Sequence, residues 1–216
     1  MRSLLFCLIL LSGCKPASYF ATPNDLHKQK AILYMKDTQK LSGELNISFE
    51  NYYSANINYN PVVVFTPEGK NEAENIKLND IAGYSVGADF YALKKIDLYM
   101  NNTFRLLFVK RLTGENSKIQ LYELYESGRG NYSGESQYSY YLSLPSYDPL
   151  QTMNTRGIGL LPSFDQKMSE IVSDCPALAE KIKLKEKGYF LAQVTFAIKK
   201  HPEVLLRIIN EYNNCK

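Results

Sequence analysis

One cysteine near the start of the chain, Cys14, stands where its thiol is open to chemical modification. It follows the positive Arg2, an apolar run over residues 4–11 and two small residues. The apolar run is too short to cross about 30 Å of hydrocarbon as a helix. Small side chains leave the peptide bond before Cys14 accessible to a protease. The pattern predicts an export signal over residues 1–13, removed so that the mature chain starts at Cys14.

The same layout resembles a bacterial lipoprotein signal, in which a peptidase cuts before a cysteine whose thiol has been lipidated. The resemblance implies a lipid such as palmitate on Cys14 and an anchor in a membrane outside the cytoplasm. The alternative is an ordinary secretory signal that happens to contain a cysteine.

A nucleophilic serine is the second candidate for chemistry. The pentapeptide at 83–87 centres on Ser85 and matches the Gly-x-Ser-x-Gly elbow of α/β-hydrolases, and Asp174 and His201 follow in that family's order. The elbow is a strained turn between a strand and a helix, with an oxyanion-binding loop upstream. No alternation of strands and helices precedes Ser85. We therefore interpret 83–87 as a strand bracketed by turn glycines and assign no catalytic residue.

Other polar patterns predict no cofactor and no metal site. The loop 128–134 has the glycines of a phosphate-binding loop, but no helix follows it. His27 and His201 are the only histidines, and neither has a metal-ligand partner at usable spacing. Glu123 and Glu126 are candidates for a glycosidase carboxylate pair whose separation the sequence does not give. A hydrolase based on Ser85 or on carboxylates stays as an alternative.

Two cysteines remain in the mature chain besides Cys14. Because Cys7 leaves with the signal, Cys175 and Cys215 are the thiols that an oxidising compartment would pair. Such a disulfide closes a loop of about forty residues and stabilises the fold by about 3–4 kcal/mol. Two buried free thiols are the alternative reading.

Tyrosines are the one unusual feature of the composition, with 17 tyrosines and no tryptophan. Tyr138, Tyr140 and Tyr141 cluster in one predicted hairpin, opposite Tyr122 and Tyr125. Cross-strand aromatic pairs stabilise a sheet, which is the structural interpretation. Adjacent residues of a strand point to opposite faces of the sheet. We do not expect both faces to be buried, so at least one of the Tyr140 and Tyr141 rings is expected at the surface. Tyr138, Tyr140 and Tyr141 are therefore a candidate surface for a glycan or a protein.

Composition and charge exclude several classes of protein. The chain is 45% hydrophobic and 22% charged, which is typical of a globular protein. Removal of Arg2 lowers the formal net charge from +3 to +2, and the basic residues are scattered among acids. We therefore predict no nucleic-acid partner. No apolar run after residue 14 has the length of a membrane-spanning helix.

The order of elements predicts an α+β fold. Residues 14–29 read as a tether without periodicity. Residues 30–150 contain short strands, among them the period-two run from Leu41 to Phe49 and a hairpin around Gly114. They predict an antiparallel domain, a rolled sheet or small barrel.

Residues 151–216 predict a small helical cap. Ser163 and Gln166 form a capping-box pattern, Asp174 is the expected N-cap of a second helix, and two further helices are expected over 190–200 and after Pro202.

Several blocks resemble a large group of exported proteins of Bacteroidota: 43–47, 64–69, 78–84, 104–107, 119–123, 174–178 and 212–215. The likeness covers nearly the whole mature chain. The group has no established function, so the resemblance implies architecture and compartment but no catalytic residues. Exposed lipoproteins of this phylum often carry acids directly after the cysteine. Here the first acid is Asp25, so we expect a lipid anchor on the periplasmic face of the outer membrane.

From these features we predict a lipid-anchored envelope protein that binds or assembles without catalysis. Its expected partners are the membrane, through Cys14, and an envelope protein or a glycan. The alternatives are the envelope hydrolase and a glycan-binding module that uses the exposed tyrosines.

Overall fold

The computed structural model describes residues 17–49, 62–97, 104–126, 137–144, 153–154, 163–191 and 201–215. Cys14 and the loop 128–134 lie outside these residues. The described strands form one sheet, in which ten strands are hydrogen-bonded side by side and the eleventh, β1, pairs with β2. The strands are β1 (Tyr19–Thr22), β2 (Asp25–Met35), β3 (Lys40–Ser48), β4 (Val62–Pro67), β5 (Glu74–Lys77), β6 (Ile81–Val86), β7 (Asp89–Asp97), β8 (Phe104–Arg111), β9 (Gln120–Glu126), β10 (Gln137–Ser143) and β11 (Met153–Asn154).

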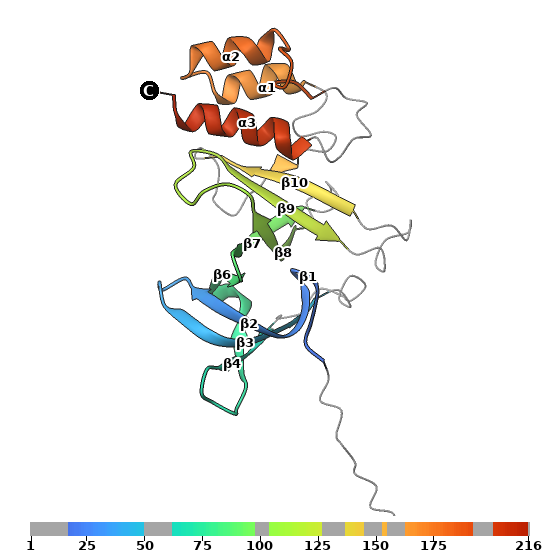
Figure 1. Ribbon diagram of the computed structural model, residues 1–216, viewed down its shortest axis with the longest axis vertical. Helices are drawn as coiled ribbons and strands as arrows, with labels where there is room; N and C mark the ends of the chain where they lie inside the picture. The colour runs from blue at the N-terminus through green and yellow to red at the C-terminus, as the bar shows by residue number, and fades with distance from the viewer. Residues whose placement is uncertain are drawn as a thin grey trace, which may run out of the picture.

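All pairings between these strands are antiparallel, as predicted. The order across the sheet is β11-β10-β9-β8-β7-β6-β2-β3-β4-β5, and β1 pairs with the start of β2. Strands β2 to β5 form one meander and β6 to β11 form a second, joined where β6 returns beside β2. Figure 1 shows β2, β3 and β4 at one end of the long axis and the helices at the other. The predicted α+β architecture, with a β-rich first part and a helical cap, is confirmed.

The first meander curls around its own hydrophobic core. Along β3 the side chains alternate, so that Leu45 and Ile47 are buried while Glu44 is exposed. Tyr84 on β6 and Phe108 on β8 are completely buried in the same cluster, with their rings in edge contact. We call this cluster the barrel core, although the curled sheet is open: in the described residues its end strands β5 and β11 do not pair with each other.

A turn between β1 and β2 closes the barrel core. The Asn24 side chain is buried and exchanges two hydrogen bonds with the main chain of Phe108, 84 residues away. Beside it, the Tyr84 hydroxyl donates to the carbonyl oxygen of Pro23 at 2.8 Å. The side chain of Asn24 therefore replaces a strand partner at this point of the sheet.

The sheet begins earlier than the sequence analysis placed it. Residues 14–29 were expected to form a tether, yet β1 starts at Tyr19 and β2 at Asp25. The segment holds a hairpin, because Pro23 and Asn24 form its turn and Tyr19 pairs with His27. Among the described residues, only residues 17 and 18 precede β1, and they are not part of a strand.

Three helices form the cap: α1 (Phe164–Ile171), α2 (Pro176–Lys183) and α3 (His201–Asn213). Their buried side chains pack with β9 and β10 in a second cluster, the cap core, which includes Leu121, Leu142, Phe164, Leu178 and Leu205. In the described residues, no helix has the length and apolar character needed to cross a membrane.

Two details of the predicted helix caps are corrected. Helix α1 starts directly after Ser163 as expected, but the Ser163 side chain makes no capping hydrogen bond. The N-cap of α2 is Cys175, and Asp174 instead accepts a hydrogen bond from Tyr212. Pro176 explains why the N-cap lies one residue later than expected. Proline is favoured at the first position of a helix, so the residue before it, Cys175, becomes the N-cap. Of the helix expected over 190–200, residues 190 and 191 are not helical and the remainder lies outside the described residues.

Candidate functional site

Ser85, the candidate nucleophile, lies inside the sheet. It is paired with Ile32 on β2 and with Phe90 on β7, so it occupies no turn between a strand and a helix. Gly87 adopts φ +59° and forms the turn from β6 to β7, as expected. Gly83 does not form a turn. It lies within β6, where an added Cβ would approach the Tyr91 carbonyl oxygen at 2.5 Å.

The two residues proposed as partners of Ser85 belong to the cap. Asp174 precedes α2 and accepts a hydrogen bond of 2.7 Å from the Tyr212 hydroxyl. His201 is the first residue of α3. Strands β7 and β8 lie between β6 and the strands β9 and β10 that the cap covers, so the structure does not bring the three residues together (Figure 1). Ser85 therefore has neither the backbone geometry of a nucleophile elbow nor the partners of a catalytic triad.

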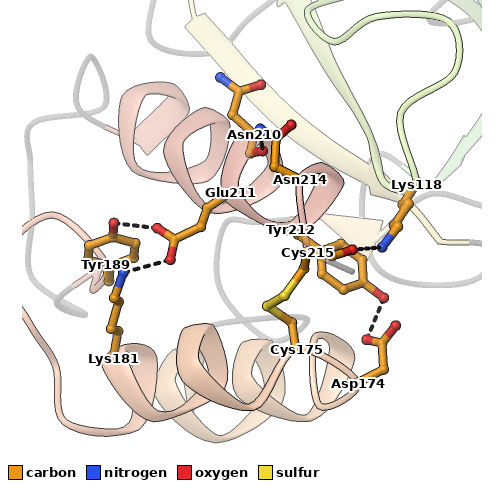
Figure 2. Close-up of a disulfide and its surroundings, with 10 residues drawn as sticks. All are labelled: Lys118, Asp174, Cys175, Lys181, Tyr189, Asn210, Glu211, Tyr212, Asn214 and Cys215. Carbon is orange, nitrogen blue, oxygen red and sulfur yellow. Dashed lines mark hydrogen bonds and ion pairs between the residues drawn. A yellow bond between two sulfur atoms is a disulfide. The ribbon is translucent and has the colours of Figure 1, made fainter.

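The two cysteines of the cap form the predicted disulfide. Cys175 at the start of α2 is bonded to Cys215 after α3, with 5.9 Å between their Cα atoms (Figure 2). Lys118, in the loop before β9, donates to the carbonyl oxygen of Cys215 at 3.1 Å, and its ammonium lies 4.6 Å from the Tyr212 ring centroid. The disulfide thus ties the residues after α3 to the start of α2, and Lys118 joins them to the loop before β9.

A second set of contacts holds α3 against α2. The Glu211 carboxylate receives hydrogen bonds of 2.6 Å from the Lys181 ammonium and from the Tyr189 hydroxyl (Figure 2). These two donors lower the pKa of Glu211, the Lys181 contact most. Each of the three side chains has a partner within this set, so we assign the set a structural role.

The predicted tyrosine surface is wrong for two of its three members. Tyr138 is 42% exposed, but Tyr140 is 4% and Tyr141 2% exposed. Tyr140 belongs to the cap core, whereas Tyr141 packs on the other side of β10 with Ala92, Ile96 and Leu124. Both faces of β10 are buried, which the sequence analysis did not expect. A flat binding surface of Tyr138, Tyr140 and Tyr141 is therefore excluded.

Glu123, a member of the candidate carboxylate pair, lies on β9 opposite Lys110 of β8, in a cluster of polar side chains. Glu126, the other member of the pair, is the last residue of β9. The charged neighbours of Glu123 are Lys110 and Asp89, which form an ion pair at 2.8 Å. Burial, helped by Asp89, raises the pKa of Glu123, while a hydrogen bond from Tyr140 and the charge of Lys110 oppose the rise.

An open hollow of about 760 Å³ lies on the outer face of the barrel sheet. Alternation along the strands puts Leu33, Leu45 and Tyr84 into the barrel core and turns their neighbours outward. The outward side chains carry ammonium, carboxylate and hydroxyl groups. We define the sheet hollow by Lys28, Lys30, Ser42, Glu44, Thr66 and Ser85.

Aromatic rings continue the outer face beyond the sheet hollow. The Tyr34 hydroxyl lies 3.5 Å from Ser85 Oγ, and its ring meets the Phe90 ring edge-on at 5.2 Å. The Arg111 guanidinium stacks over Phe90 at 4.4 Å from the ring centroid. The missing side chain of Gly83 makes room for the Phe90 ring. Tyr34, Phe90 and Arg111 form a group beside the hollow, which we call the aromatic wall. None of the three lines the hollow itself, and Tyr34 joins the two through its contact with Ser85.

No local sequence pattern indicated the aromatic wall. Phe90 and Arg111 were recognised only as strand residues, because their proximity depends on the pairing of β6 and β7 with their neighbours.

In the part of the chain that the structure describes, no group of three or more histidine, cysteine or acidic side chains is placed to hold a metal ion. Comparisons with protein-family models, with curated proteins and with solved structures found no match to this chain.

Proposed function

We propose that the chain is a lipid-anchored component of the bacterial cell envelope that binds its ligand without catalysis. The lipoprotein pattern at Cys14 and the resemblance to exported proteins of Bacteroidota support the anchor and the outer-membrane location. The Cys175–Cys215 disulfide is consistent with an oxidising compartment. The location on the periplasmic face is proposed from the lack of acids directly after Cys14.

The observation that carries the binding function is the sheet hollow with its aromatic wall. Its hydroxyl, ammonium and carboxylate groups offer both donors and acceptors to a polar ligand. The Phe90 and Tyr34 rings offer apolar area beside them. A glycan carries hydroxyl groups and apolar C–H faces together, so it is the ligand class that this combination fits best. The glycan-binding alternative therefore moves from Tyr138, Tyr140 and Tyr141 to the hollow.

The anchor is tested by labelling cells with an alkyne fatty acid and fractionating them. The wild-type protein is expected in the outer-membrane fraction with label on Cys14. The Cys14→Ala variant is expected to lose both the label and the membrane association. An unlabelled wild-type protein that fractionates with soluble proteins would refute the anchor.

Binding is tested by co-sedimentation of the purified protein with insoluble envelope glycan. Phe90→Ala removes part of the wall, and Ile32→Glu adds a charge at a position that is 38% exposed in the hollow. Each is expected to weaken retention about tenfold, as for central residues of a binding site. Tyr138→Ala is the matched control, because Tyr138 is 42% exposed and lies outside the hollow. Equal retention of all four proteins would contradict binding through the hollow.

A further inference from the structure

The connection between the proposed lipid and the folded domain is short. Only residues 15–18 separate Cys14 from Tyr19, the first residue of β1. Five fully extended residue steps reach at most about 18 Å. Strand β2, with eleven residues, is about 36 Å long. A lipid on Cys14 would therefore keep the start of β1 close to the bilayer, because the connection is only about half as long as one strand of the barrel.

Strand β1 is attached firmly to the barrel. Tyr19 and Phe20 pair with His27 and Leu26 of β2. The Phe20 ring packs against Tyr91 at 5.5 Å, and the Tyr19 hydroxyl donates to Asp25 at 3.0 Å. The turn after β1 is held by the hydrogen bonds to Phe108 and from Tyr84. A constraint on β1 is therefore a constraint on the whole barrel.

The side chains at the start of β1 are aromatic and exposed. Tyr19 is 47% and Phe20 36% exposed, which makes them two of the five exposed large hydrophobic side chains among the described residues. As neighbours in a strand they point to opposite sides of β1. When the strand axis points at the bilayer, the two residues differ in depth by only about 3.3 Å. Tyrosine is enriched at membrane–water interfaces, where its ring meets both apolar and polar surroundings.

We propose that Tyr19 and Phe20 lie in the interfacial layer of the phospholipid bilayer that holds the lipid on Cys14. The inference rests on the proposed lipid anchor. It adds a second membrane contact and fixes the orientation of the domain. The start of β1 faces the membrane. Figure 1 shows the helical cap beyond β9 and β10 as seen from β1, so the cap points away from the membrane.

The lack of tryptophan allows a direct test of this orientation. Phe20→Trp gives the otherwise tryptophan-free chain a single reporter at β1. Leu184→Trp is the matched control in the cap, at a position that is 65% exposed. Both full-length proteins are isolated in lipidated form and placed in vesicles of phosphatidylethanolamine and phosphatidylglycerol, with or without bromine on the acyl chains. Quenching by bromine reports contact of the indole with the bilayer.

The proposal predicts blue-shifted emission of Phe20→Trp and at least twofold quenching by the brominated lipid. Leu184→Trp is expected to show neither change. A protein that floats with the vesicles while Phe20→Trp stays unquenched would overturn the proposal and leave the anchor intact. A protein that does not float would refute the anchor itself, and the membrane contact with it. Because Phe20 packs on Tyr91, Tyr19→Trp serves as a second reporter with the same expected result.

Discussion

The side chain of Asn24 and the main chain of Phe108 exchange two hydrogen bonds across 84 residues of sequence. Asn24 Nδ2 donates to the Phe108 carbonyl oxygen at 3.0 Å, and the Phe108 N–H donates to Asn24 Oδ1 at 2.8 Å. Both residues are buried, so neither backbone group has water as a substitute partner. This pair joins the β1–β2 turn to β8 and closes the barrel core.

Asn24→Ala is expected to destabilise the protein by about 2–5 kcal/mol, because it leaves two buried backbone groups unsatisfied. Urea unfolding followed by circular dichroism measures the change. Asn75→Ala is the matched control, since Asn75 is exposed on the edge strand β5 and should change the free energy of unfolding by less than about 0.5 kcal/mol. Equal stabilities of the two variants would contradict the role of Asn24.

Reduction of the Cys175–Cys215 disulfide is expected to lower the free energy of unfolding by about 4 kcal/mol in the chain-entropy model, given the separation of 40 residues. The measurement is urea unfolding with and without dithiothreitol. The double variant Cys175→Ser/Cys215→Ser should match the reduced wild type and should not respond to the reductant. A wild type whose unfolding is unchanged by reduction would show that the bridge contributes nothing.

Local patterns predicted much of the fold. The alternation in residues 41–49 placed Leu45 and Ile47 in the core, and Ser163 marked the start of α1 correctly. Both signals arise within a few residues of chain. The β1–β2 hairpin was missed because its turn is stabilised by Phe108 and Tyr84, which are distant in sequence.

The candidate site was predicted less well, for a related reason. The burial of both Tyr140 and Tyr141 depends on packing against elements on either side of β10, and a single strand sequence does not contain that information. The aromatic wall of Tyr34, Phe90 and Arg111 comes from three strands. Its members become neighbours only through the register of the sheet.

The polar cluster around Glu123 is expected to make stability depend on pH. Because burial raises the pKa of Glu123 in the folded protein, its charged form is less favourable there than in the unfolded chain. The associated stability is present at acid pH and is lost as the pH rises through the folded-state pKa. Glu123→Gln should therefore gain stability relative to wild type as the pH increases.

Urea unfolding of both proteins between about pH 4 and about pH 7 measures this difference. Lys110, Asp89, Tyr91 and Tyr140 face the same cluster and are unchanged in the variant, so the comparison isolates Glu123. Parallel pH profiles of the two proteins would contradict the prediction.

Ser85 is expected not to react as a catalytic nucleophile. Its place within β6 provides neither a nucleophile elbow nor a histidine partner from the cap. The wild-type protein should therefore remain unlabelled by a serine-directed fluorophosphonate at concentrations that label a serine hydrolase fully. Labelling that disappears in Ser85→Ala would favour the envelope hydrolase instead.

The sheet hollow is tested most directly inside the cell. A photo-reactive amino acid replaces Ile32 in the lipidated protein, and Leu184 in the cap is replaced in a matched control. After irradiation, the adducts are identified by mass spectrometry. We expect a discrete adduct with a glycan fragment from position 32 alone, and its loss when Phe90→Ala is added. No adduct from position 32, or the same adducts from both positions, would contradict binding through the hollow.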